Sequence, residues 1–419
     1  MRYQTLADWL AWQETLHPTA IDLGLERVGE VLGRMGLGRP SHAVVTVAGT
    51  NGKGSSVAML DAILRAAGYR VGTYTSPHLL RYNERIRIDG NEVSDQALCT
   101  AFARVDEARG DISLSYFEFG TLAALDLLER AGLDAAVLEV GMGGRLDAVN
   151  LLDADVALIT PIDMDHAEWL GPDRERIARE KAGIFRAGRP AVCSDPNPPA
   201  ALFSEAERIG AELLILGRDF DFTVDGGQWW WRGRLQRRDG LPLPALRGVS
   251  QPQNAAGVLM VLEQLTARLP VYQQDVRAGL SSVQLPGRFQ VLPGEVTRIF
   301  DVGHNPHAAA ELARNLVAHD CAGRTRLVIG MLADKDAAGV VAQLAAQVDA
   351  WYVAGLDGAR GAGPERVAGV LKDAGIVAVQ AFPGVSAALV RALADAVPGD
   401  RVVVFGSFHT VAEAFAGSV

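Results

Sequence analysis

Near its N-terminal end the chain carries the run Val44-Val45-Thr46-Val47-Ala48-Gly49-Thr50-Asn51-Gly52-Lys53-Gly54-Ser55-Ser56. Its first part is apolar and β-branched, as in a buried strand, and its second part is a glycine-rich turn. The apolar spacing of residues 57–64 predicts a helix directly after the turn. A strand, a glycine turn and a helix N-terminus form an anion-binding site, because backbone N–H groups and the helix dipole both favour negative charge there.

The turn also supplies side chains that suit a nucleoside triphosphate. Lys53 brings a positive charge to phosphate oxygens, and Ser55 or Ser56 offers a hydroxyl to phosphate or magnesium. The standard phosphate loop G-x-x-x-x-G-K-[ST] would have glycine at Val47 and a hydroxyl residue at Gly54. An ordinary glycine-rich turn is the alternative interpretation. We predict a nucleotide site, because the Gly-Lys pair stands between strand and helix as a phosphate loop requires.

Composition limits the class of protein. At 419 residues the chain is too long for one typical core, so two or more domains are expected. A net charge of −10 argues against a nucleic-acid binder that relies on phosphate contacts. The three widely spaced cysteines form no metal or redox pattern, which suits a reducing compartment. With no signal-like N-terminus and no 18-residue apolar run, we expect a cytoplasmic protein without a membrane segment.

Short apolar strands alternate with helices through the first 210 residues. Strands are predicted at 70–75, 135–140 and 155–160, and helices at 3–16, up to Met35 and over 118–130. Fully apolar strands are typical of parallel sheets, which carry nucleotides at the carboxyl ends of their strands. Residues 81–87 are polar and basic at their start, which favours an exposed loop.

The pattern changes after residue 211. Residues 220–224 and 229–232 flank Asp225-Gly226-Gly227, which predicts a hairpin with tryptophans that pack rather than stack on a ligand. After a helix at 253–267 and a break rich in proline and glycine, strands are predicted at 297–301, 326–330, 350–354, 376–380 and 401–405. We therefore predict an α/β protein in three parts. They are a phosphate-loop ATPase domain (1–287) with a mainly parallel sheet plus a small antiparallel sheet, a linker (288–296), and a Rossmann-like α/β domain (297–419).

Glu139 lies near the end of the strand predicted at 135–140. A buried glutamate must be paired or bind metal, so Glu139 is a candidate magnesium ligand, with a structural ion pair as the alternative. The glycines at 141, 143 and 144 do not complete a dinucleotide fingerprint, because Leu146 occupies its last glycine position. A dinucleotide oxidoreductase is therefore the weakest alternative.

Three further positions follow predicted strands or lie on a short helix. Two acids and His166 follow the strand at 155–160, which suggests metal binding or catalysis, although a lone histidine is more often structural. Composition alone places Lys181 on the surface. Asp301 ends a strand of the second domain and precedes a polar turn with His304, where α/β sheets carry ligands. A capped turn without function is the alternative there.

Six stretches, in order and across essentially the whole chain, resemble the folylpolyglutamate synthase branch of the Mur ligase superfamily. The resemblance is close to its bacterial form, which doubles as dihydrofolate synthase. The stretches are Gly49-Thr50-Asn51-Gly52-Lys53-Gly54-Ser55, Thr75-Ser76-Pro77-His78-Leu79, Leu138-Glu139-Val140-Gly141-Met142-Gly143-Gly144-Arg145-Leu146-Asp147, Asp165-His166, Arg179-Glu180-Lys181-Ala182-Gly183-Ile184 and Phe405-Gly406-Ser407-Phe408-His409. The family's usual Asp-Gly-Ala-His-Asn-Pro is here Asp301-Val302-Gly303-His304-Asn305-Pro306.

The resemblance implies a nucleotide and metal site. The ATP phosphates would be held by Gly49, Thr50, Asn51, Gly52, Lys53, Gly54 and Ser55, with further ATP contacts from Asn254, Arg288 and Asp301. Magnesium would be bound by Ser76, Glu139 and His166. Lys181 matches a family lysine that is carboxylated to a carbamate, an anion able to bind a hard cation.

The resemblance also implies where the other substrates bind. The pterin site would draw on Ile21, Asp22, Leu23, Ser115, Tyr116, Phe117, Glu118, Leu146, Asp147 and Ala148. His304 and Ser407 match positions near the glutamate end. The implied catalytic residues are Lys53, His166, Lys181 and His304.

The implied reaction is that of an ATP-dependent carbon–nitrogen ligase. L-glutamate would be added to dihydropteroate, forming dihydrofolate, and to reduced folates, forming folylpolyglutamates, through an acyl phosphate. The alternatives are a folylpolyglutamate synthase only, another Mur-type amino-acid ligase, or a phosphate-loop switch that makes no product. We expect a monomer with small-molecule partners, and neither nucleic acid nor membrane among them.

Overall fold

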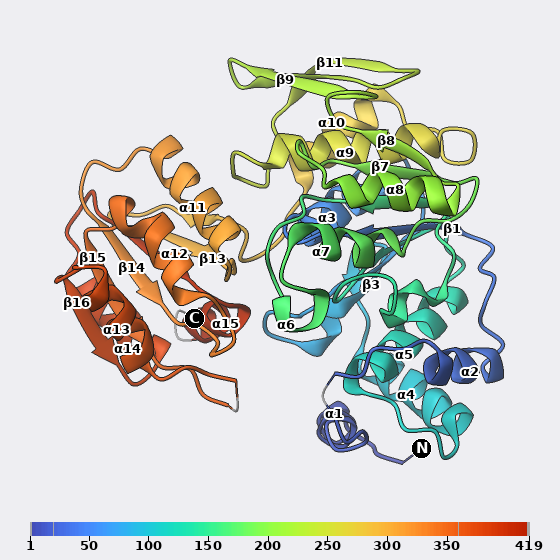
Figure 1. Ribbon diagram of the computed structural model, residues 1–419, viewed down its shortest axis with the longest axis horizontal. Coiled ribbons are helices and arrows are strands. Elements are labelled where there is room, and N and C mark those ends of the chain that lie inside the picture. Colours follow the sequence, from blue (N-terminus) through green and yellow to red (C-terminus); the bar gives the residue numbers. More distant parts are fainter. Residues whose placement is uncertain (1, 20, 359, 417–419) are drawn as a thin grey trace. The chain divides into compact units, whose positions relative to one another are not determined.

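The computed structural model describes residues 2–19, 21–358 and 360–416 and forms two compact units (Figure 1). The first unit holds the chain up to Ala245 together with Pro252–Val283. The second holds Leu246–Gln251 and the chain from Gln284 onward. Each unit is a sheet flanked by helices, so the predicted two-domain α/β class is confirmed.

The first unit is built on an eight-stranded sheet with the order β4-β3-β2-β5-β1-β6-β7-β8. The strands are β1 (Ala43–Ala48), β2 (Val71–Tyr74), β3 (Ile86–Ile88), β4 (Asn91–Glu92), β5 (Ala135–Glu139), β6 (Val156–Ile159), β7 (Pro190–Cys193) and β8 (Glu212–Ile215). All neighbours from β2 to β8 are parallel, and β3 and β4 add an antiparallel edge. The pairing of Val47 with Glu139 brings the turn after β1 to the same sheet edge as Glu139.

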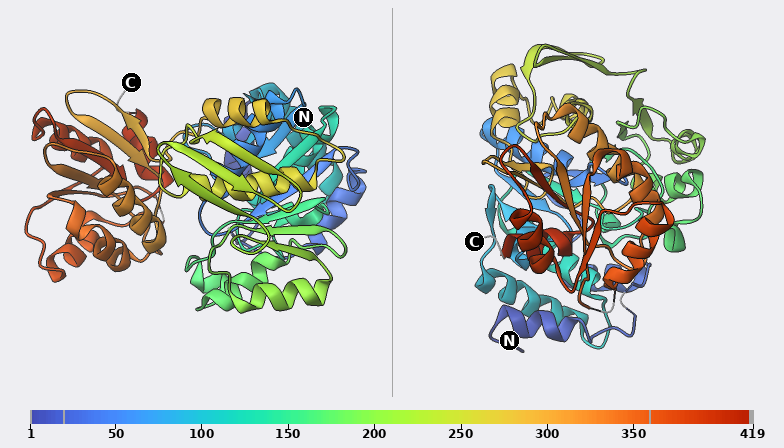
Figure 2. Two further views of the ribbon diagram at one scale, coloured as in Figure 1. Left: turned by 90° about the horizontal axis from the view of Figure 1, so that it is seen from above. Right: turned by 90° about the vertical axis from the view of Figure 1, so that its left-hand side faces the viewer.

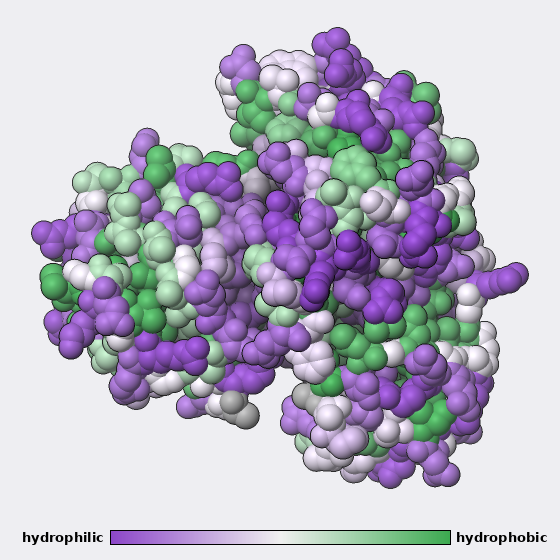
Figure 3. All heavy atoms as spheres, viewed as in Figure 1, coloured by the Kyte–Doolittle hydropathy of each residue, from purple (hydrophilic) through white to green (hydrophobic). Residues whose placement is uncertain are grey.

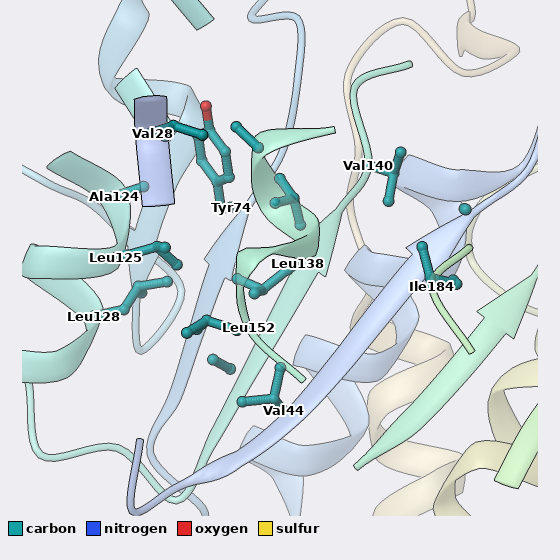
Figure 4. Close-up of a cluster of buried hydrophobic side chains, with 14 of the residues drawn as sticks. Val28, Val44, Tyr74, Ala124, Leu125, Leu128, Leu138, Val140, Leu152 and Ile184 are labelled. Carbon is teal, nitrogen blue, oxygen red and sulfur yellow. The ribbon is translucent and has the colours of Figure 1, made fainter. Parts of the chain in front are cut away.

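Helices cover this sheet and close its core. They are α1 (Leu6–Gln13), α2 (Glu26–Arg34), α3 (Lys53–Ala66), η1 (Tyr82–Arg85), α4 (Asp95–Arg109), α5 (Tyr116–Arg130), η2 (Ala148–Leu151), α6 (Ala167–Leu170), α7 (Arg174–Ala182), α8 (Ala200–Ile209), α9 (Gln251–Gln264) and α10 (Gln273–Ser282). Figure 4 shows Leu125 and Leu128 of α5 facing Leu138 of β5, all of them buried. Packing of this kind fixes β1 and β5, and hence the ends of both strands.

A small antiparallel sheet with the order β11-β10-β9 lies against α9 and α10 (Figures 1 and 2). Its strands are β9 (Asp221–Asp225), β10 (Gln228–Arg232) and β11 (Arg237–Pro242). The predicted hairpin is confirmed, whereas β11 was not predicted, because Asp239 and Gly240 interrupt its apolar pattern. The indole Nε1 of Trp231 donates to the carbonyl oxygen of Ala256 in α9 at 3.1 Å, so this tryptophan packs as predicted.

The second unit has a six-stranded sheet with the order β12-β13-β17-β14-β15-β16. The strands are β12 (Gln290–Leu292), β13 (Thr297–Asp301), β14 (Thr325–Ile329), β15 (Ala350–Ala354), β16 (Val379–Phe382) and β17 (Arg401–Phe405), and the helices are α11 (Pro306–Ala318), α12 (Ala337–Leu344), η3 (Ala345–Gln347), α13 (Pro364–Asp373), α14 (Val385–Ala394) and α15 (Phe408–Ala416). β12 is antiparallel to β13 and lies inside the 288–296 segment that the sequence assigns to the linker. The other pairs are parallel, as in a Rossmann-like sheet.

Within the described ranges, none of the helices has the length and apolar character needed to cross a membrane. Figure 3 shows hydrophilic side chains over much of the displayed face, with smaller hydrophobic areas between them. Such a mixture is ordinary for a globular surface.

Candidate active site

The turn between β1 and α3 needs glycine at two positions. Gly52 is the N-cap of α3 with φ 91°, a left-handed conformation that favours glycine. A Cβ atom on Gly52 would lie 2.6 Å from Oδ1 of Asn254, and one on Gly49 would lie 1.8 Å from Oγ1 of Thr160. Both glycines therefore allow a close approach, and Asn254 stands at the N-terminus of α3.

Two polar side chains of this turn, Lys53 and Ser56, bond to its own backbone. Nζ of Lys53 donates to the carbonyl oxygens of Gly49 at 3.1 Å and Thr50 at 3.0 Å. The hydroxyl of Ser56 donates to the carbonyl oxygen of Gly52 at 2.9 Å, within the first turn of the helix. Ser55, the hydroxyl residue within the quoted phosphate-loop motif, is buried one position earlier.

Lys181 is buried in α7, with 4% of its surface exposed, so the surface position favoured by composition is wrong. Its Nζ donates to the carbonyl oxygen of Gly49 at 2.7 Å. Burial, and to a smaller extent the charge of Lys53, lowers the pKa of this amine to about 7, while Asp165 and Asp147 oppose the shift. The structure thus places a second amine, partly neutral at pH 7, against the phosphate loop.

Glu139 ends β5 with a buried carboxylate, and the backbone N–H of Ser76 donates to its Oε2 at 3.4 Å. β2 and β5 are neighbours, which explains why the segment after β2 meets Glu139. Across residues 2–19, 21–358 and 360–416, no three or more His, Cys, Asp or Glu side chains group as a metal site. The predicted set of Ser76, Glu139 and His166 contains only two such residues. It fits magnesium, which is usually held by one or two carboxylates plus substrate phosphates and water.

His166 follows β6 in a left-handed conformation with φ 51° and ψ 39°. Its backbone N–H donates to Oδ1 of Asp165 at 2.9 Å, and its Nε2 lies 3.9 Å from the same oxygen. Three residues before His166, the backbone N–H of Asp163 donates to Oγ1 of Thr50 at 3.0 Å. The segment after β6 is therefore tied directly to the phosphate loop.

Two of the three predicted pterin segments are joined by Arg27, which sequence reasoning missed. Nη1 of Arg27 donates to Oδ2 of Asp22 at 2.6 Å, and Nη2 donates to Oε1 of Glu118 at 3.1 Å. Glu118 and Ser115 form the capping box of α5. On a short amphipathic helix Arg27 looks like an ordinary surface residue, so only its spatial partners identify it.

The third pterin segment meets the second around Gly141. A Cβ atom on Gly141 would lie 2.7 Å from Cζ of Phe117 and 3.3 Å from Oδ2 of Asp147. Burial raises the pKa of Asp147 to about 6, although hydrogen bonds from Met142, Val149 and Gly141 backbone N–H groups lower it. The other members of the three segments are half-buried or buried: Ile21, Leu23, Tyr116, Leu146 and Ala148.

In the second unit the carboxylate of Asp301 is bound by backbone groups. Oδ1 accepts from the N–H of Gly303 at 2.8 Å and Oδ2 accepts from the N–H of Phe289 at 3.0 Å. Burial nevertheless raises the pKa of this carboxyl. The glycine of this turn stands at position 303, one residue later than in the family's usual motif. A Cβ atom on Gly303 would lie 2.6 Å from Cε2 of Phe405, so packing requires a glycine at this position.

Ser407 is buried and caps α15. Its Oγ accepts from the backbone N–H of Thr410 at 3.0 Å and lies 2.7 Å from Oγ1 of Thr410. Oγ1 of Thr410 donates to the carbonyl oxygen of Gly330 at 2.7 Å, which ties β14 to α15. Thr410 was not predicted, because a buried threonine in an apolar helix gives no sequence signal.

The remaining predicted residues of this unit lie on the segment after Val283 and on the turn after β13. The guanidinium of Arg288 stacks over the ring of Phe408 at 4.9 Å. Nδ1 of His304 donates to the carbonyl oxygen of Val302 at 3.1 Å, which leaves Nε2 as the acceptor nitrogen when the ring is neutral. The predicted ATP contacts are divided between the units, with Asn254 in the first and Arg288 and Asp301 in the second.

The exposed loop predicted at 81–87 is wrong in its central part. Tyr82, Asn83 and Arg85 are buried, and the segment folds as η1 and β3. The amide of Asn83 donates to the carbonyl oxygen of Val93 at 2.8 Å, and the ring of Tyr82 packs on Phe102. These partners are distant in sequence or lie in another element, so local polarity did not indicate burial.

Comparison with known proteins identifies the family. The Mur ligase middle domain matches residues 47–219, and the Mur ligase glutamate ligase domain matches residues 287–408. The dihydrofolate synthase/folylpolyglutamate synthase of Escherichia coli (strain K12) is 48% identical over 407 residues, which cover 97% of this chain and 94% of that relative. The protein of the same name from Mycobacterium tuberculosis (strain ATCC 25618 / H37Rv) is 36% identical over 363 residues, 80% of this chain and 73% of that relative.

Solved structures agree with these relatives. E. coli FolC in complex with DHPP and ADP matches with a TM-score of 0.94 and 47% identity, covering 99% of this chain and 97% of that chain. A bifunctional folylpolyglutamate synthase/dihydrofolate synthase with Mn, AMPPNP and L-glutamate bound matches with a TM-score of 0.92 and 47% identity, covering 99% of this chain and 98% of that chain. At this identity and coverage, the chain belongs to the dihydrofolate synthase/folylpolyglutamate synthase family of Mur ligases.

Proposed function

We propose that this chain is an ATP-dependent ligase that adds L-glutamate to dihydropteroate, forming dihydrofolate, and to reduced folates, forming folylpolyglutamates. The observation that carries the proposal is the contact of Lys181 with the phosphate loop, 2.7 Å from Nζ to the carbonyl oxygen of Gly49. A phosphate loop alone serves many nucleotide-binding proteins. A second buried lysine beside it, with Asp147 and Asp165 near enough to affect its pKa, suits metal-assisted phosphoryl transfer.

The phosphate loop would bind and orient ATP. Backbone N–H groups of the turn and the N-terminus of α3 favour the phosphates, and Asn254 adds an amide beside Gly52. Lys53, now bonded to two loop carbonyls, would exchange these for phosphate oxygens and neutralise their charge. Bound with magnesium, ATP supplies the phosphoryl group that activates a substrate carboxylate as an acyl phosphate.

The magnesium ion would be held by Ser76, Glu139 and His166, with the carbamate of Lys181 as a further oxygen donor. The neutral amine that a carbamate needs is available near pH 7, because burial disfavours the ammonium form. Of the three predicted ligands only Glu139 is a carboxylate, so most of the oxygens that magnesium prefers would come from the Ser76 hydroxyl, the carbamate, phosphate and water.

The pteroate-type substrate and L-glutamate would be bound by residues of different units. In the first unit two of the three pterin segments meet around Phe117, Gly141 and Asp147, where a flat ring can lie against an aromatic face. In the second unit His304 and Ser407 stand at the carboxyl ends of β13 and β17, the edge of an α/β sheet where ligands bind, and would orient L-glutamate. Arg288 and Asp301 would complete the nucleotide contacts.

We further propose that the enzyme works as a monomer in the cytoplasm. Light scattering of the purified chain measures its mass in solution and so tests the monomeric state.

The decisive experiment supplies ATP, magnesium and L-glutamate with either dihydropteroate or tetrahydrofolate, and follows ADP and product mass. Both substrates should gain one glutamyl residue per ADP formed. Lys53→Ala, with an unchanged thermal melt, is the matched control and should form no product. Product from tetrahydrofolate alone would reduce the function to a folylpolyglutamate synthase, and product from neither would overturn the proposal.

A further inference from the structure

A short tether between β11 and α9, Leu246–Gln251, belongs to the second unit, although the chain on both sides of it belongs to the first. Directly before the tether, the backbone N–H of Ala245 donates to the carbonyl oxygen of Leu280 at 2.8 Å. Directly after it, Nε2 of Gln253 donates to the carbonyl oxygen of Ser194 at 2.9 Å. Both flanks of the tether are therefore fixed to the first unit.

Asn315 of α11 fixes the tether itself to the second unit. Asn315 is 7% exposed, and its Oδ1 accepts from the backbone N–H of Val249 at 2.8 Å. Gly248 has φ 132°, and a Cβ atom there would lie 3.3 Å from Nδ2 of Asn315, so glycine allows the tether to approach closely. The Ser250 side chain also hydrogen-bonds to Glu311, one turn earlier in α11. Two side chains of α11 thus hold consecutive residues of the tether.

The tether leads directly into the helix that carries a proposed ATP contact. Its last residue, Gln251, begins α9, and Asn254 follows three residues later in the same helical turn. Asn254 is buried, and its Oδ1 lies 2.6 Å from the position of a Cβ atom on Gly52, so its amide stands against the phosphate loop. A rigid helical turn transmits a displacement from one end to the other. The position of the tether therefore affects the position of Asn254.

We propose that Asn315 is a positioning residue for nucleotide binding, which holds the tether and, through the first turn of α9, the amide of Asn254. The inference rests on the function proposed above, which assigns Asn254 to ATP. Within residues 21–358 the chain passes between the units at three points, after Ala245, Gln251 and Val283. The second point lies in the first turn of α9, so any movement of the second unit acts directly on the helix that carries Asn254.

The test is a double-mutant cycle on ADP binding by the full chain, with Asn315→Ala, Asn254→Ala and the variant that carries both. Asn315→Asp keeps an acceptor oxygen for the N–H of Val249. The matched control is Val341→Ala, which opens a cavity in the core of the second unit and leaves the bond between Asn315 and Val249 in place. Thermal melts check folding. Gly248→Ala, which strains the tether and crowds Asn315, replaces Asn315→Ala if that variant does not fold.

Titration calorimetry with ADP and magnesium measures the dissociation constants. Asn315→Ala should weaken ADP binding by about threefold or more, while Asn315→Asp and Val341→Ala should bind ADP like the wild type. In the Asn254→Ala background the loss of the Asn315 amide should have no further effect, because its effect passes through Asn254. An unchanged affinity of Asn315→Ala, an equal loss in Val341→Ala, or an equal loss in both backgrounds would overturn the inference. A wild type that binds ADP but forms no product would contradict the proposed function alone, because ADP binding needs no turnover.

Discussion

At the scale of single residues, the surroundings of Lys181 control the chemistry of its amine. Burial and the charge of Lys53 lower its pKa from an ordinary 10.5 to about 7, so the neutral form exists above pH 7 and is lost as the pH falls below it. Only the neutral amine attacks carbon dioxide, forming a C–N bond and releasing a proton.

We therefore expect a carbamate on Lys181 that disappears on acidification through about pH 7. The measurement is carbon-13 NMR of metal-stripped protein in labelled bicarbonate, with dissolved carbon dioxide held constant between pH 6 and 8. Lys181→Arg is the control and should give no signal, because a guanidinium forms no carbamate at these pH values. A wild type without signal at pH 8 would contradict the prediction.

The same residue gives a prediction for activity. Lys181→Ala should be nearly inactive and partly restored by acetate, whose carboxylate can occupy the vacated space beside Gly49. Lys181→Arg should stay inactive with acetate, because its positive charge would repel the metal ion. Initial rates of ADP formation with and without acetate measure both. Full activity of Lys181→Arg would show that no carbamate is needed.

Glu139 provides the third prediction at this scale. Glu139→Gln replaces a carboxylate by a neutral amide, a poor ligand for a hard divalent cation. The magnesium concentration that gives half of the variant's own maximal activity should be higher than that of the wild type by about tenfold or more. A magnesium titration of ADP formation measures this, and an unchanged midpoint would assign Glu139 to the structural class.

At the scale of elements, contacts between residues close in sequence could be predicted, whereas contacts between residues far apart in sequence could not. β1, the glycine turn and α3 are contiguous, so strand pattern, turn residues and helix pattern all indicated them. The contact of Lys181 with Gly49 spans 132 residues, and neither composition nor periodicity indicated it. Only the family motif placed Lys181 in the site. Arg27 and Thr410 belong to no quoted motif, which is why they were missed.

The helix α15 gives a prediction of its own. Oγ1 of Thr410 joins the carbonyl oxygen of Gly330 to the N-cap residue Ser407, so Thr410→Val leaves two buried polar groups without this partner. Unfolding of the second unit should become easier by about 1–3 kcal/mol, while Thr410→Ser, which keeps the hydroxyl, should lose less. Urea denaturation followed by fluorescence compares the three proteins. Equal midpoints for the valine variant and the wild type would show that this link adds nothing to stability.

At the scale of the whole molecule, positive charge has to be placed locally in a chain whose net charge is negative. The chain carries a net charge of −10, yet its proposed substrates are nucleotides, folates and glutamate, all of them anions. Binding therefore depends on local cations and helix N-termini that are shielded from the overall negative field. In the first unit Lys53 supplies such a cation and is partly buried, and the magnesium ion proposed at Glu139 would add further positive charge.

One set of such cations implies one site for both reactions. Dihydropteroate and tetrahydrofolate should then compete, each inhibiting glutamylation of the other with an inhibition constant close to its own KM. Product mass separates the two reactions in a mixture, so both rates can be followed at once. Lys53→Ala should remove both together, because each reaction needs the same charge on the transferring phosphoryl group. Additive rates without mutual inhibition, or a Lys53→Ala variant that loses one reaction and keeps the other, would require two separate sites in this chain.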